Sequence, residues 1–138
     1  MSSSCPLCQQ DGGQIVWQNT LARVVLADEP NYPGFCRVIL NRHAAEMSDL
    51  SAQERHDLMN IVWAVETVQR KVLKPTKINL ASLGNMVPHL HWHIIPRWHD
   101  DLHFPAPVWA SAEAGRAIHA ISDEQLNHLR EQLEQLTP

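Results

Sequence analysis

The order of strand-like and helix-like segments predicts an α+β fold with a mostly antiparallel sheet. Short β-branched apolar runs come first, followed by a long amphipathic segment, two more strand-like runs and a second amphipathic segment. Strands joined by tight turns favour antiparallel pairing, and helices set apart from the strands cover one face of such a sheet. A chain of 138 residues with 44% hydrophobic side chains suits one domain, residues 1–138.

The first three strands are predicted over residues 14–18, 21–28 and 36–41. Only two polar residues separate the first two runs, which is typical of a β-hairpin. Between the second and third strands, residues 28–34 contain two prolines, an asparagine and a glycine. We therefore expect a loop there.

Capping boxes predict where the two main helices begin. Ser51 stands three residues before a glutamate and is followed by apolar residues at helical spacing, so a helix is expected to end shortly before Pro75. Ser122 stands three residues before a glutamine and opens a second helix over about residues 122–136.

Two further strands are predicted after the first helix, over residues 77–82 and 89–95. Pro96 is expected to end the second of these strands, because proline cannot donate to a sheet ladder. The proline-rich residues 100–108 indicate irregular structure, and residues 110–120 indicate a short helix.

Composition and charge exclude several broad classes. Eleven Lys and Arg against fifteen Asp and Glu give a net charge of -4, which argues against binding to nucleic acid polymers or to anionic membrane surfaces. The N-terminus shows no signal-peptide pattern, and no apolar run approaches the roughly 20 residues of a membrane-spanning helix. We expect a cytoplasmic protein with reduced thiols, since three cysteines do not make a disulfide framework.

Nine histidines are many for this chain, and three of them occupy the last predicted strand. His89, His91 and His93 alternate with apolar residues, which puts the three imidazoles on one strand face. They could be solvated surface residues, metal ligands, or a centre for covalent catalysis in which a neutral imidazole attacks phosphorus. Catalysis is favoured, because polar groups on a half-buried face need partners or a use.

Residues 89–95 read His-φ-His-φ-His-φ-φ, in which φ is apolar, and this pattern resembles the signature of the histidine triad (HIT) superfamily. Asp28 and the turn after it look like the family's nucleoside-binding half. Residues 84–88 look like its phosphate-binding loop, and residues 104–109 look like the tail of a short bacterial branch. The resemblance covers about residues 14–110. It implies about five antiparallel strands, two main helices and a two-fold homodimer with the long helix at its interface.

The resemblance implies a nucleotide hydrolase or transferase that acts at a nucleoside α-phosphate. His91 would attack the phosphorus and form a nucleotidyl-histidine, His93 would contact phosphate oxygens, and His89 would orient the site and assist proton transfer. Dinucleoside polyphosphates and nucleoside phosphoramidates are the implied substrates. The covalent step needs no cofactor, although a divalent cation could accompany a polyphosphate. The alternatives are a nucleotide-binding regulatory module with vestigial hydrolysis and a zinc hydrolase that uses the triad as ligands.

The resemblance also implies substrate contacts outside the triad. Asp28 matches the acidic residue that binds the ribose hydroxyls, with capping of the following turn as the alternative. Asn79 and Asn85 match amide positions at the phosphates. Asn85 replaces the more usual glutamine, which leaves the leaving-group specificity open. We interpret Arg97 as a solvated cation at the strand end, with a phosphate contact as the alternative.

Cys5 and Cys8 have the spacing of half a zinc site. His43 and His89 could supply the other two ligands. This set resembles the structural zinc site of the galactose-1-phosphate uridylyltransferases, which are relatives of the HIT proteins. The alternative is a pair of small buried cysteines without metal.

Overall fold

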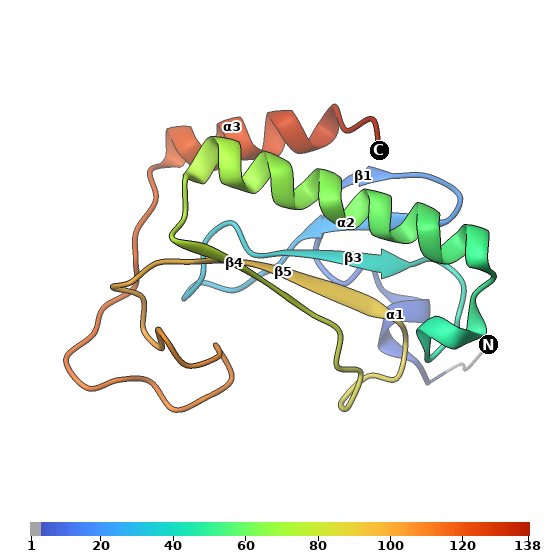
Figure 1. The fold of residues 1–138 in the computed structure, drawn as a ribbon, viewed down its shortest axis with the longest axis horizontal. Helices are drawn as coiled ribbons and strands as arrows, with labels where there is room; N and C mark the ends of the chain where they lie inside the picture. Colours follow the sequence, from blue (N-terminus) through green and yellow to red (C-terminus); the bar gives the residue numbers. More distant parts are fainter. Residues whose placement is uncertain (1–3) are drawn as a thin grey trace.

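A computed structural model describes residues 4–138 as a five-stranded antiparallel sheet with two main helices packed on one face (Figure 1). The spatial order of the strands is β1-β2-β3-β5-β4. The strands are β1 (Gln14–Gln18), β2 (Ala22–Leu26), β3 (Cys36–Leu40), β4 (Lys77–Ala81) and β5 (His91–Arg97). The helices are α1 (Pro6–Gln9), the 3-10 turn η1 (Met47–Asp49), α2 (Ala52–Leu73) and α3 (Asp123–Glu134). The predicted α+β class and the five antiparallel strands are thus confirmed.

The two faces of the sheet differ in chemistry because the strand residues alternate. One face packs against α2 and α3 and forms the main core, in which Val24, Val38 and Ile94 are fully buried. The other face carries the strand residues that alternate with those of the core, including Arg37, His91 and His93. We call this second surface the histidine face.

Both main helices begin at the predicted caps. The Ser51 hydroxyl accepts a hydrogen bond from the Glu54 backbone N–H, and the Glu54 carboxylate accepts one from Ser51 N–H. Helix α2 ends at Leu73, and Lys74, which follows it, adopts a left-handed conformation just before Pro75. The buried amide of Gln69 donates to two backbone carbonyls, at Gly34 (2.9 Å) and Ile94 (3.0 Å), and so joins α2 to the sheet.

The predicted bounds of the last strand were wrong by two residues. The strand begins at His91 rather than at residue 89, and Pro96 lies inside it instead of ending it. Strand β3 pairs with β5 only as far as Ile94, so beyond that residue β5 is hydrogen-bonded on one side only, to β4. Proline is tolerated where one side of a strand has no ladder to complete. His89 therefore precedes the strand.

The predicted helix over residues 110–120 was also wrong, since this stretch contains no helix. Most of its residues are exposed, and without an apolar face to bury, a short segment gains too little to form a helix. The single-turn elements α1 and η1 were missed because they are too short to leave a periodic pattern.

Within residues 4–138, no helix combines the length and the apolar character of a membrane-spanning segment. Met1 to Ser3, on which the prediction about a signal peptide partly rests, lie outside the described residues.

Candidate active site

Strands β3 and β5 position two of the three triad histidines. The register sets Ile39 opposite His91 and Arg37 opposite His93. The rings of His91 and His93 project from the same face and meet edge to face, with centroids 4.8 Å apart. Two imidazoles are thus held side by side on rigid backbone.

His91 has one ring nitrogen committed to the backbone. Its Nδ1 lies 2.6 Å from the carbonyl oxygen of His89. A carbonyl only accepts, so Nδ1 carries the proton and Nε2 holds the lone pair. Burial, opposed by the His89 bond and assisted by the Arg37 charge, lowers the pKa of His91 below 6.5. Near neutral pH, His91 is therefore an uncharged imidazole with a nucleophilic Nε2.

His93 is more deeply enclosed. Its ring meets Phe35 and Trp109 edge to face, at centroid distances of 5.6 Å and 5.2 Å. Burial, with the nearby His91 and Arg37, lowers the pKa of His93 to about 4. Its Nδ1 is buried and has no hydrogen-bond partner among the described residues. Such a group normally finds a partner, so this atom stands out as available.

His89 lies in a different environment. It is fully buried, and its Nε2–H donates to the Leu40 carbonyl at 2.6 Å. Its Nδ1 therefore presents a lone pair to the sulfur atoms of Cys5 (3.4 Å) and Cys8 (3.5 Å). Burial lowers the pKa of His89. Both of its nitrogens are engaged away from the histidine face.

Cys5, Cys8, His43 and His89 form a cluster that could hold a metal ion. Their ligand atoms all lie within 4.8 Å of one another, and Cys8 Sγ is 3.3 Å from His43 Nδ1. The turn of α1 brings the two cysteines together, through backbone hydrogen bonds from Cys8 and Gln9 to the Cys5 carbonyl. Two thiolates and two imidazoles are a common tetrahedral donor set for zinc. In the part of the chain that the structure describes, no other such group occurs, and this one excludes His91 and His93.

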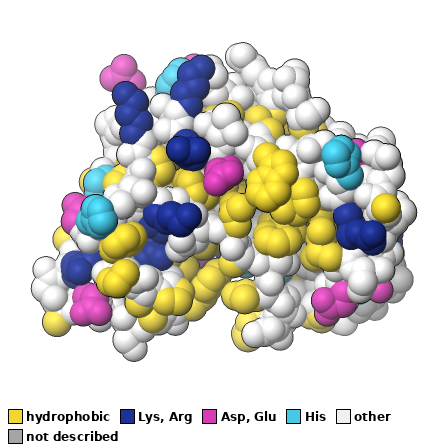
Figure 2. Space-filling view, viewed as in Figure 1, with side chains coloured by type: hydrophobic (Ala, Val, Ile, Leu, Met, Phe, Trp, Pro, Cys, Tyr) yellow, Lys and Arg dark blue, Asp and Glu magenta, His cyan; other side chains and the backbone are white. Residues whose placement is uncertain are grey.

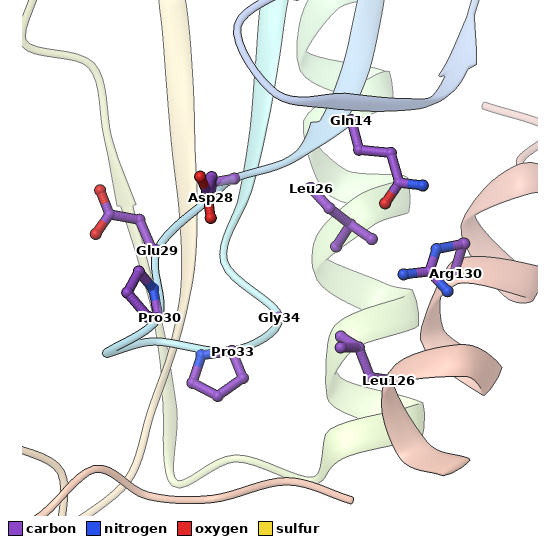
Figure 3. A pocket seen from close by; sticks show the side chains of 10 residues that line it. Gln14, Leu26, Asp28, Glu29, Pro30, Pro33, Gly34, Leu126 and Arg130 are labelled. Atoms are coloured by element: carbon purple, nitrogen blue, oxygen red, sulfur yellow. The ribbon is translucent and has the colours of Figure 1, made fainter. Parts of the chain in front are cut away.

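Asp28 lies apart from the triad on the loop after β2. It is exposed and lines a cavity of about 370 Å³ between this loop and α3. Figure 3 shows Asp28 on one side of this cavity and Arg130 reaching toward it from α3. No triad histidine lines this cavity.

The two predicted amide residues differ in setting. Asn79 on β4 accepts a hydrogen bond from Arg97 Nη1 at 2.7 Å, so its amide oxygen is occupied. Asn85 is exposed on the loop that leads to His89. A pocket of about 410 Å³ beside His91 is lined by other parts of this loop, from Ser82 to Gly84, and by η1.

Both interpretations of Arg97 were wrong. It is 1% exposed and forms an ion pair with Asp101, at 2.8 Å from Nε and 3.1 Å from Nη2. Burial alone would raise the pKa of Asp101, but Arg97 and three backbone N–H groups outweigh it and hold that pKa well below its usual range. Arg97 is therefore neither solvated nor open to a phosphate. His103, which is stacked on Tyr32, joins the same cluster.

Sequence reasoning missed Arg37, which is the only charged residue in the apolar run of β3. The signal was present, because alternation along this strand puts Arg37 on the histidine face once β3 and β5 are paired. It also missed Trp109 as a neighbour of His93, for which residue spacing gives no signal.

Comparisons with known proteins identify the family of this chain. The HIT domain model matches residues 9–100. An AP-4-A phosphorylase of Mycobacterium tuberculosis (strain ATCC 25618 / H37Rv) is 30% identical over 105 residues, which make up 72% of this chain and 54% of that protein. A bis(5'-nucleosyl)-tetraphosphatase (asymmetrical) of Schizosaccharomyces pombe is 33% identical over 91 residues, which make up 62% of this chain and 50% of that protein. This chain thus spans about half the length of these curated relatives.

Solved structures give the same result. A histidine triad protein from Bradyrhizobium japonicum superposes with a TM-score of 0.75 at 28% identity, covering 96% of each chain. A zinc-bound histidine triad family protein from Mycobacterium smegmatis shares the fold, with a TM-score of 0.67 at 18% identity over 96% of this chain and 94% of that one. Since the HIT model covers well over half of the 138 residues, the chain belongs to the HIT domain family.

Proposed function

We propose that this protein cleaves the bond between a nucleoside α-phosphate and its leaving group through a covalent nucleotidyl-histidine on His91. The observation that carries the proposal is the hydrogen bond from His91 Nδ1–H to the His89 carbonyl, which leaves Nε2 as the nucleophile. The nucleotide-processing relatives in the family support the same class of activity, nucleotide hydrolysis or transfer.

In the first displacement, the Nε2 lone pair of His91 attacks the α-phosphorus and forms a P–N bond. The bond from phosphorus to the leaving group breaks, and the leaving group keeps that electron pair and takes up a proton. Positive charge develops on the His91 ring, and the His89 carbonyl stabilises it through the Nδ1–H bond. His93 would contact the phosphate oxygens, because its ring adjoins that of His91.

In the second displacement, water attacks the same phosphorus and loses a proton. The P–N bond breaks, His91 regains its lone pair, and a nucleoside monophosphate is released. An acceptor other than water would make the protein a transferase. His89 acts here as a positioning residue, since both of its ring nitrogens are engaged elsewhere.

Dinucleoside polyphosphates and nucleoside phosphoramidates are the proposed substrates. Asp28 would accept hydrogen bonds from the ribose hydroxyls, and Asn79 and Asn85 would lie toward the phosphates. With a polyphosphate, a divalent cation would neutralise part of the phosphate charge.

We further propose that Cys5, Cys8, His43 and His89 bind a structural zinc ion. The Nε2–H of His89 donates to a carbonyl, which is the usual arrangement behind a metal-binding histidine. When bound, zinc would tie the N-terminal segment to His89, whose carbonyl fixes the tautomer of His91. Metal analysis of the purified protein should find about one zinc per chain, and Cys5→Ser should lose it. Zinc-free wild-type protein would contradict this proposal.

A two-fold homodimer in the cytoplasm is part of the same proposal. Helix α2 exposes Trp63, which is 46% accessible, and Figure 2 shows apolar side chains near the middle of the face drawn in Figure 1. Light scattering of the purified chain tests the dimer.

The covalent step is tested by trapping. Wild-type protein is mixed with a dinucleoside polyphosphate labelled at the α-phosphorus, quenched in base and mapped by mass spectrometry. We expect label on His91, none in His91→Ala, and normal labelling in the matched control His128→Ala, which changes an exposed histidine of α3. Full turnover by His91→Ala would overturn the mechanism.

A further inference from the structure

Arg37 is a half-buried cation on the histidine face, and the chemistry proposed above gives it no role. The β3–β5 register pairs it directly with His93. Its charge contributes to the lowered pKa of both His91 and His93, which reflects its proximity to the two rings. A positive charge next to the nucleophile suits an anionic substrate.

The other arginines of this face are fully engaged. Arg23 is buried and donates to the backbone carbonyls of Leu7 (2.7 Å), Gln10 and Asp11. Arg97 is buried in the ion pair with Asp101. Neither has a guanidinium open to a ligand, so both act as structural residues.

Arg37 has weak partners by comparison. Its Nη1 donates one long hydrogen bond, 3.4 Å, to the Gly12 carbonyl. Its Nη2 lies 3.6 Å from a Glu29 carboxylate oxygen, beyond hydrogen-bond distance, and the Glu29 side chain is 42% exposed. A guanidinium has five N–H donors, so residues 4–138 leave most of those on Arg37 available. Exposed ion pairs of this kind contribute little and exchange easily.

The neighbouring ring of Phe35 orients the guanidinium. Arg37 Cζ lies 5.3 Å from the Phe35 centroid, and the same ring meets His93 edge to face. Phe35 therefore contacts both the cation and a triad imidazole. A planar guanidinium over an aromatic ring keeps its N–H groups pointing outward in one plane, which is the geometry that grips two phosphate oxygens at once.

We propose that Arg37 binds phosphate oxygens of the nucleotide, which displace Glu29 from the guanidinium. Arg37 is thus a binding residue that selects phosphorylated nucleosides, and Glu29 competes with the phosphate for it. This inference rests on the proposed function, because it takes the substrate to be a nucleotide.

Binding of adenosine and of AMP by calorimetry tests the assignment without turnover. Charged hydrogen bonds of this kind are worth roughly 10- to 100-fold in affinity. Arg37→Met should weaken AMP binding by about that factor while adenosine binding changes less than about twofold. Arg37→Lys should recover part of the AMP affinity. Glu29→Gln should tighten AMP binding by up to about fivefold, the value of an exposed ion pair.

The matched control is Arg70→Met, which removes the same charge from an exposed position on α2. It should leave both affinities unchanged, and thermal unfolding checks that every variant folds. Equal weakening of adenosine and AMP in Arg37→Met, no weakening of AMP, or wild-type protein that binds no AMP would each overturn the inference. Failure to trap phosphate on His91, with Arg37-dependent AMP binding intact, would instead overturn the proposed function alone.

Discussion

The two ends of β5 place buried polar side chains on the same sheet face, but only those at the C-terminal end have all their hydrogen-bond partners within the described chain. At the C-terminal end, Arg97 and Asp101 satisfy each other, and Asp101 also accepts hydrogen bonds from the N–H groups of Trp98, His103 and Phe104. At the N-terminal end, His93 Nδ1 is buried without a partner among residues 4–138, and His91 uses only Nδ1.

This difference separates a cluster whose polar groups satisfy one another from one whose polar atoms remain open to a ligand. The polar groups of Arg97 and Asp101 are hydrogen-bonded to each other and to nearby backbone groups. These bonds hold the segment that carries Trp109 against His93. The imidazoles of His91 and His93 leave hydrogen-bonding atoms without a partner among residues 4–138, which lowers stability unless a ligand binds them. The two ends of β5 are distinguished by how many hydrogen-bond partners their polar side chains have, and residue type alone does not reveal this.

The largest effect on stability is expected from Asp101→Asn. The substitution removes the charge that compensates buried Arg97, so the free energy of unfolding should fall by about 3–5 kcal/mol. Urea denaturation measures the loss. The neighbouring exposed residue gives the control, because Asp100→Asn breaks only a surface contact with His119 and should cost less than about 1 kcal/mol. If the two variants were equally stable, the C-terminal end would not be the structural cluster described above.

At the other end of β5, His93→Leu should separate stability from function. The substitution removes a buried polar atom that has no partner, so the free energy of unfolding should change by less than about 1 kcal/mol or rise. Turnover should fall by roughly 10²- to 10⁴-fold, as expected for a group that binds the reacting phosphate in the transition state. Urea denaturation and steady-state kinetics on the same preparation give both values. A loss of stability as large as that of Asp101→Asn would show that both ends are structural.

Much of the site followed from local pattern. Alternation put His91 and His93 on one face, because a period of two is a property of any strand. The Cys-x-x-Cys spacing pointed to Cys5 and Cys8 as half of a cluster that could hold a metal ion, because one helical turn brings such residues together. These signals lie within a few residues of one another.

The rest depended on contacts between distant residues. Arg97 looked solvated because nothing in the sequence next to it announces the ion pair with Asp101 or the bond to Asn79. Pro96 lies inside β5 because β3 begins at Cys36, opposite Ile94, and no residue in β5 itself encodes that. The proximity of Arg37 to the triad is evident only from the strand register, which sets it opposite His93.

The smallest expected effect is on the pH dependence of stability, in which the two ends of β5 should contribute over different pH ranges. His93 has a pKa of about 4 when folded and 6.5 when unfolded, so the unfolded state binds more protons between these values. Its contribution is therefore complete above pH 6.5 and is lost as the pH falls toward 4. The pKa of Asp101 is lowered from 3.8, so its contribution is present above 3.8 and is lost only at more acidic pH.

Urea midpoints measured from pH 7 down to pH 3 should therefore decline in two windows. His93→Leu should flatten the decline between pH 6.5 and 4 and leave the loss at more acidic pH unchanged, because the histidine that is uncharged in the folded protein is gone. Asp101→Asn should do the reverse, flattening the acidic window from an already lower starting stability. Burial also lowers the pKa of His89 and of His91 from 6.5, so their contributions to stability also begin to be lost below pH 6.5, and His93→Leu should remove only part of that slope. An unchanged upper window in His93→Leu would mean that His93 is not held neutral by burial, and the contrast between the two ends of β5 would then rest on hydrogen bonding alone.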